Sequence, residues 1–364
     1  MRQMKKTLIT IFTSLIFFSC GKVNNEHTLL YLVNERPDEV VIVDTSDQKV
    51  INRFMAGEGL NDLTLIPNQG IGFIANQHGG VISVVDLNMG TLESEIPTNG
   101  FPLHLTSPPS GEKVYATVAN PETLQANEVS VFSVESSSFI ESIPVGNTIN
   151  NIEIHPDGKT LYATRANTAM LFLVDTVEKI IKKEKVLSNS PAAMAVSPDG
   201  KYIALALTQT DTVQIYDQNA EDLIFSIPVG DAPRAVTFSD DGKLVLAADM
   251  RTRFVHIAKT DTGEIIGKIK FDMAPTNLRV VNGKVWATVK APFIFGADLT
   301  SLEITDKIHL NSIPVTFEAV APNKLSLSDN DSGLPIVEIA IFLVIFYLIK
   351  KGKRQEKKEG KEDN

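Results

Sequence analysis

A motif that recurs every 42 residues constrains this chain more than any other feature of its sequence. The stretch SPDGKYIALAL, with its turn glycine at Gly200, is followed by SDDGKLVLAAD, where Gly242 stands 42 residues later, and HPDGKTLYATR places Gly158 42 residues earlier. Aligning further copies on the turn glycine adds Gly70, Gly111 and Gly283, with successive spacings of 41, 47, 42, 42 and 41. A fixed period of this length predicts a repeat architecture, in which each unit buries its faces against its neighbours.

Each copy has the pattern of four short strands. A strand such as AMAVS precedes the turn Pro-Asp-Gly, in which proline presets φ and glycine accepts a positive φ. A second strand such as KYIALAL follows, then a third that ends in aspartate, as in VISVVD and LFLVD, then a fourth such as LIFSIPVG. The alternation and the β-branched residues favour strands over helices between residues 28 and 328. The 47-residue spacing is explained by an insertion, NPETLQANE, within the third copy.

Four antiparallel strands repeated about seven times predict an all-β fold, a seven-bladed β-propeller of four-stranded antiparallel blades. The first copy begins at LLYLVN and lacks an inner strand, whereas the fragment VTFEAVAPN from Val315 matches an inner strand without its blade. We therefore expect the C-terminal fragment to complete the first blade and close the ring.

The repeat resembles the YVTN-type β-propeller repeat, whose pattern combines SPDGK, a following strand, a third strand ending in aspartate and I-x-V-G-x-x-P. Here the matching pieces are HPDGKTLYATRAN, SPDGKYIALAL, IPVGNTIN and IPVGDAPRAV, and the resemblance covers residues 28–328. It implies the propeller fold, which surface-layer and secreted binding proteins share with lactonases, haem d1 domains and amine dehydrogenase subunits. It does not imply one activity, because the motif residues form turns and cores.

The N-terminal residues predict export. A basic start, an apolar run and Ser19-Cys20-Gly21 predict a lipoprotein signal peptide over residues 1–20, with Cys20 as the lipidation site, followed by a linker over 21–27. A plain signal peptide with an incidental cysteine is the alternative.

The C-terminal residues predict a membrane anchor. The apolar run 334–349 is expected to form a single transmembrane helix, with a basic cytoplasmic tail over 350–364. The alternative is a final buried strand with a free tail. Together the two ends place the propeller outside a bacterial membrane, in the periplasm or beyond it, with membrane lipid and an envelope protein as expected partners.

Charge and cysteine content exclude several classes of protein. The net charge is −10, and because the first 20 residues carry three positive charges and the last 15 carry seven against four acids, the remainder carries −16. Such a surface would repel nucleic acid. The single cysteine excludes internal disulfides, multi-cysteine metal sites and c-type haem attachment. The six histidines lack metal-site spacing, so no metal and no cofactor are expected.

In a propeller, the loops between second and third strands lie on the same face as the joins between blades. We expect this face to carry the ligand-binding residues Asn34, Asn76, His78, Asn120, Asn167, Gln209, Asp249 and Arg251. The repeated asparagines also suit turns, since their side chains bond to nearby backbone, and the repeated strand-three aspartates are expected to cap turns.

Two functions fit these features. The first is a non-catalytic binding or scaffold module that presents its polar loop face to a protein, glycan or small molecule. The alternative is a lactonase-like hydrolase at the mouth of the central channel, for which His104, Arg165, Arg234 and Glu153 are the candidate catalytic residues. The sequence lacks a G-x-S-x-G elbow and a P-loop, so the non-catalytic function is favoured.

Overall fold

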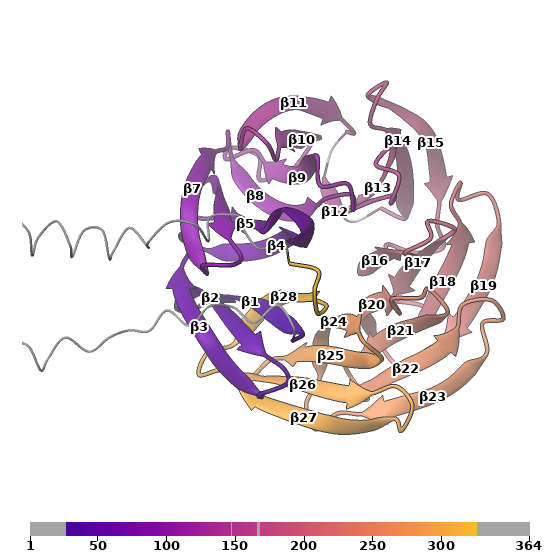
Figure 1. The fold of residues 1–364 in the computed structure, drawn as a ribbon. Coiled ribbons are helices and arrows are strands. Elements are labelled where there is room, and N and C mark those ends of the chain that lie inside the picture. The colour runs from indigo at the N-terminus through magenta and orange to yellow at the C-terminus, as the bar shows by residue number, and fades with distance from the viewer. Residues whose placement is uncertain (1–26, 147, 166–167, 326–364) are drawn as a thin grey trace, which may run out of the picture. The chain divides into compact units, whose positions relative to one another are not determined.

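The computed structural model describes residues 27–325 except 147 and 166–167, and in this part of the chain 28 strands form seven four-stranded antiparallel sheets arranged in a ring (Figure 1). We number these blades from the one that contains the first strand. The innermost strands of successive blades contact one another around the ring. The predicted all-β, seven-bladed fold is confirmed.

The first three blades use strands up to Pro144. Blade 1 contains β28 (Pro314–Val320), β1 (Leu29–Glu35), β2 (Asp38–Asp44) and β3 (Lys49–Met55). Blade 2 contains β4 (Leu60–Ile66), β5 (Ile71–Asn76), β6 (Val81–Asp86) and β7 (Thr91–Pro97), with a short 3-10 helix, η1 (Pro67–Gln69), in its first turn. Blade 3 contains β8 (Phe101–Thr106), β9 (Lys113–Ala119), β10 (Glu128–Ser133) and β11 (Ser138–Pro144).

The remaining blades follow in chain order. Blade 4 contains β12 (Ile149–Ile154), β13 (Thr160–Arg165), β14 (Met170–Asp175) and β15 (Ile180–Val186), and blade 5 contains β16 (Ala193–Val196), β17 (Tyr202–Leu207), β18 (Thr212–Asp217) and β19 (Leu223–Pro228). Blade 6 contains β20 (Pro233–Phe238), β21 (Leu244–Asp249), β22 (Phe254–Lys259) and β23 (Ile265–Lys270). Blade 7 contains β24 (Pro275–Val281), β25 (Lys284–Val289), β26 (Phe293–Asp298) and β27 (Glu303–His309).

Local sequence explains the turns of each blade. Gly158, Gly200 and Gly242 adopt φ values of 72°, 76° and 68°, where a side chain would be strained. The aspartates that end third strands accept bonds from backbone N–H groups two and three residues later, as Asp86 does from Asn88 and Met89 and Asp298 from Thr300 and Ser301. Their predicted role as turn caps is confirmed.

The core lies between blades, which is why no blade is expected to fold alone. The second strands are almost entirely buried, whereas outer strands such as β7 and β15 are mostly exposed. One cluster joins Tyr31 of blade 1 to Leu63 and Ile74 of blade 2, and the buried hydroxyl of Tyr31 donates to the carbonyl of Leu87 at 2.9 Å. Each interface therefore depends on two blades.

The ring closes where the C-terminal strand enters the first blade. Strand β28 pairs antiparallel with β1, and Phe317 lies opposite Leu32. Phe317 is fully buried beside Trp286 of blade 7, the only tryptophan of the chain. The side chain of Arg53 joins the same seam through Glu39 and the Leu310 carbonyl. The predicted closure by the fragment from Val315 is confirmed, and the strand begins one residue earlier, at Pro314.

The segments predicted at the two ends of the chain fall outside the described residues. This applies to the predicted signal peptide with Cys20, to residues 21–26 of the predicted linker 21–27, and to the segments 334–349 and 350–364. Among residues 27–325, no helix is long and apolar enough to cross a membrane. The anchors therefore stay predictions.

Candidate functional site

The principal cavity runs along the centre of the ring and is bounded by the innermost strands of all seven blades. Its volume is about 1030 Å³, which is the size of a pocket for a small organic ligand. Residues of β4, β8, β12, β16, β20, β24 and β28 line it, together with residues of the blade-joining and second-to-third-strand loops. We refer to this cavity as the channel.

Strand alternation arranges the channel wall in two rings of side chains. Each innermost strand pairs with its neighbour in the same register, so equivalent positions can be matched between blades. Residues two apart on a strand face the same side. The middle ring consists of Thr64, Thr106, Glu153, Ala195, Thr237, Arg279 and Glu318. The upper ring, nearer the starts of these strands, consists of Asp62, His104, Asn151, Ala193, Ala235, Asn277 and Thr316.

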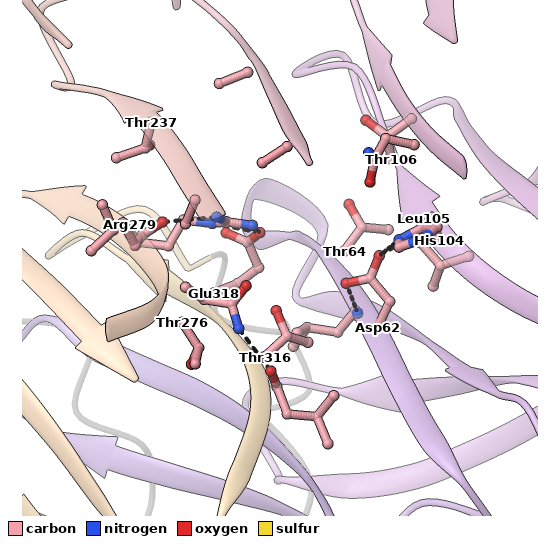
Figure 2. A pocket seen from close by; sticks show the side chains of 18 of the residues that line it. Asp62, Thr64, His104, Leu105, Thr106, Thr237, Thr276, Arg279, Thr316 and Glu318 are labelled. Atoms are coloured by element: carbon pink, nitrogen blue, oxygen red, sulfur yellow. Dashed lines mark hydrogen bonds and ion pairs between the residues drawn. The ribbon is translucent and has the colours of Figure 1, made fainter. Parts of the chain in front are cut away.

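An ion pair between neighbouring blades occupies part of the middle ring. Arg279 donates from Nε and Nη2 to Oε1 of Glu318, at 2.8 and 2.5 Å, and from Nη1 to the carbonyl of Leu278 (Figure 2). Burial lowers the pKa of Arg279, because it disfavours the charged form. The carboxylates of Glu318, Glu153 and Asp62 have a larger opposite effect, and the pKa is raised above its usual value. Arg279 is therefore a fixed cation whose guanidinium lies in the channel wall.

Glu153 is the most perturbed acid of the channel. Burial raises its pKa to about 8, and the nearby carboxylates of Glu318 and Asp62 add to the rise. The charge of Arg279 and a hydrogen bond with Thr106 act in the opposite direction and are weaker. At neutral pH most Glu153 side chains therefore hold a proton, and the carboxyl group can donate a hydrogen bond to a ligand as well as accept one.

Asp62 and His104 face each other across the join between blades 2 and 3. His104 Nδ1 lies 3.6 Å from Asp62 Oδ2, and the same oxygen accepts a bond from the backbone N–H of Leu105. The other oxygen of Asp62 accepts from the N–H of Leu63. Figure 2 shows this pair on the side of the channel opposite Arg279 and Thr237. The carboxylate therefore lies beside one nitrogen of the imidazole.

Two exposed cations lie at the end of the channel where the blade-joining loops meet. Arg234 is the second residue of β20 and is exposed, and Lys290 follows β25 on the next blade. Neither forms an ion pair or a side-chain hydrogen bond within the described part of the chain. Their charges are consequently available to an anionic group.

The channel brings together three of the four candidate catalytic residues. His104, Arg234 and Glu153 all line it. Arg165 does not, because its guanidinium stacks 4.7 Å above the ring of Phe172 at the end of β13. Asp62, Arg279 and Glu318 were not predicted, because the turn-glycine spacing puts Arg279 out of step with Glu153 by one residue and no turn glycine follows Glu318.

The residues expected on the loop face have mixed surroundings. Asn34, Asn76 and Asp249 are fully buried: Asn76 donates to the Ala56 carbonyl and to Ser83, Asn34 donates to Ser312, and Asp249 accepts from the N–H groups of Arg251 and Thr252. These bonds favour structural roles.

The other residues expected on the loop face lie at the surface, except Asn167, which is outside the described residues. The Asn120 side chain accepts from the N–H groups of Glu122 and Thr123 and borders a second, smaller cavity of about 480 Å³. His78 and Gln209 are exposed, Arg251 pairs with Asp231, and Asn167 lies outside the described residues.

No group of three histidine, cysteine or acidic side chains in the described residues could hold a metal ion. Within residues 27–325, the channel side chains supply proton donors, proton acceptors and charges, but no set of metal ligands.

Comparison with known protein families now adds a sequence relationship to the fold. The model of the family described as YNCE-like beta-propeller matches residues 23–226, more than half of the chain. The chain belongs to the YNCE-like β-propeller family. A second model, described as lactonase, 7-bladed beta-propeller, matches residues 188–277 of this YNCE-like propeller. The predicted resemblance to these propellers is confirmed. No curated protein matches the chain in sequence.

Solved structures share the fold of this YNCE-like propeller at low sequence identity. A protein of unknown function from Desulfotomaculum acetoxidans has a TM-score of 0.69 at 12% identity, over 81% of this chain and 99% of that one. Hydrazine synthase from Kuenenia stuttgartiensis has a TM-score of 0.63 at 18% identity, over 79% and 94%. The dihydro-heme d1 dehydrogenase NirN, solved in complex with DHE, has a TM-score of 0.62 at 14% identity over 79% of this chain, and only 65% of the NirN chain is covered. These likenesses establish the fold alone.

Proposed function

We propose that this protein is a non-catalytic binding propeller of the bacterial cell envelope, and that its channel holds a small polar molecule. The observation that carries the proposal is the channel itself, a cavity of about 1030 Å³ whose wall presents charged and hydroxyl side chains on two levels. Pockets of this kind, with a few convergent polar groups, are where propellers and other folds bind ligands. The apolar export pattern and Cys20 support the location in the envelope.

Filling the channel without removing a polar group tests this proposal. Ala195 is the smallest member of the middle ring, so Ala195→Trp places a large side chain in the channel. Ser226 is exposed on β19 of the same blade, and Ser226→Trp is therefore the matched control. Each protein is dialysed against a small-molecule extract of bacterial envelopes, and the retained compounds are identified by mass spectrometry.

We expect wild type and Ser226→Trp to retain the same compound and Ala195→Trp to lose it. Retention by Ala195→Trp, or no retention by any of the three proteins, would contradict binding in the channel. Attachment to the membrane is tested separately by palmitate labelling, which Cys20→Ser should abolish.

A hydrolase remains the second candidate because of the Asp62–His104 pair. A carboxylate 3.6 Å from one imidazole nitrogen can orient the ring for proton transfer by the other. The lactonase match over residues 188–277 is compatible with this chemistry. Turnover of a lactone panel that His104→Ala abolishes would favour this candidate over the binding module.

A further inference from the structure

The basic and acidic side chains of the channel are divided between its two sides. The cations Arg234, Arg279 and Lys290 all belong to blades 6 and 7. The carboxyl groups of Glu318, Asp62 and Glu153 belong to blades 1, 2 and 4. Blade 5, which separates the two groups on one side, contributes only Ala193 and Ala195 to the two rings.

The structure leaves part of each charge set without an internal counterion. Arg279 and Glu318 neutralise each other at 2.5 Å. Arg234 and Lys290 form no ion pair within the described residues, and both are exposed. On the other side, the nearest cationic candidate for Asp62 is His104 at 3.6 Å, and its two oxygens otherwise accept only backbone N–H groups.

We infer that the channel binds a zwitterionic solute of the amino-acid or short-peptide class, with its carboxylate toward Arg234 and Lys290 and its ammonium toward Asp62 and Glu153. This inference rests on the proposed binding function and specifies its ligand class. Charged groups on both ends of a ligand suit a site with two cations, unpaired within the described residues, on one wall and the carboxylate of Asp62 on the other. The carboxyl group of Glu153 adds a hydrogen-bond acceptor beside Asp62. The hydroxyl groups of Thr64, Thr106, Thr237 and Thr316 supply neutral hydrogen-bonding partners between the ends.

The inference is tested with tri-alanine and its capped forms. An extended tripeptide spans about 10 Å, and acetylation removes only its positive charge while amidation removes only its negative one. Affinities of the four forms (free, acetylated, amidated and doubly capped) are measured by calorimetry at pH 7 in low salt. We expect free tri-alanine to bind most tightly and each cap to weaken binding by about tenfold, the effect of losing one charge-assisted contact.

Substitutions on each side of the channel test which side contacts the carboxylate of the peptide and which contacts its ammonium group. Arg234→Gln with Lys290→Gln should weaken free tri-alanine about tenfold and leave the amidated form unchanged, because in that form the carboxylate is already absent. Asp62→Asn should weaken free tri-alanine and leave the acetylated form unchanged. The control removes two lysines that follow the turn glycines Gly200 and Gly242, as Lys201→Gln with Lys243→Gln. Both side chains are at least 70% exposed, and their loss should change no affinity.

The possible failures are distinguishable. If capped and free forms bind equally and Ala195→Trp abolishes their binding, the charge assignment is wrong and channel binding stands. If free tri-alanine binds equally to wild type and to Ala195→Trp, the channel is not its site and both proposals fail for this ligand. If no form binds, the inference of a short-peptide zwitterion is overturned, whereas the extract experiment still decides the proposed function. Retention of the Trp286 emission spectrum shows that each variant is folded, except in Ala195→Trp, where circular dichroism replaces it.

Discussion

Replacing Glu153 by glutamine should remove a pH-dependent cost from the folded state. Glutamine keeps the shape of the side chain and can still bond to Thr106, but it does not ionise. An ordinary glutamate titrates at 4.5, whereas the folded protein holds this proton to about pH 8. Between these values the folded state binds one more proton than the unfolded state, so raising the pH lowers stability.

The magnitude follows from the size of the pKa difference. A difference of about 3.5 units at about 1.4 kcal/mol per unit sets an upper bound of about 5 kcal/mol. The channel is open to water, which solvates the ionised carboxylate, and we therefore expect about 2 kcal/mol at pH 8.5. Glu153→Gln should match wild type at pH 4.5 and exceed its free energy of unfolding by this amount at pH 8.5.

The assay is urea unfolding at pH 4.5, 6.5 and 8.5, followed by the fluorescence of Trp286, which is buried at the closing seam. Glu184→Gln is the control, since Glu184 is exposed on the outer strand β15 of the same blade. If wild type and Glu153→Gln lose stability equally between pH 4.5 and 8.5, Glu153 is not the buried acid that the channel geometry implies.

Three further substitutions test the packing that supports the channel. Phe317→Ala should lower the free energy of unfolding by about 3–5 kcal/mol, measured by urea unfolding, because Phe317 is fully buried in the closing strand; Phe139→Ala, at 52% exposure, should cost far less. Tyr31→Phe removes the buried hydroxyl bond to Leu87 and should cost about 1–2 kcal/mol in the same assay. Asn76→Ala should cost about 2 kcal/mol and leave ligand retention by mass spectrometry unchanged, since Asn76 bonds only within the fold. If folded Asn76→Ala no longer retains the ligand, Asn76 takes part in ligand binding and its role is not only structural.

The repeat made the architecture predictable because its turns carry their own chemistry. Glycine at positions such as Gly200 accepts a positive φ, and the spacing of these turns revealed the repeat, while the strand pattern between them indicated four strands per blade. The missing inner strand of the first copy and the orphan strand at Val315 together specified the closure. The start of β28 at Pro314 could not be fixed, since strand ends depend on pairing with β1.

The candidate site was only partly predictable. Glu153 stood out as an acid on an inner strand, and His104 and Arg234 lie near the joins between blades. Arg279 and Glu318 were missed because each sits in a strand that reads as ordinary core, and their pairing across 39 residues is a property of the ring. Burial of Asn34 and Asn76 was equally hidden, because a turn asparagine can face the solvent or the neighbouring blade with the same sequence.

The location of the bound ligand is the most direct test of the account. Crystals of the wild-type propeller grown with the compound that it retains should show density between the inner strands, in contact with Glu153 or Asp62 on one side and with Arg234 or Lys290 on the other. Density confined to the outer strands or to the groove beside Asn120, with an empty channel, would contradict the proposal that this propeller binds its ligand along the axis.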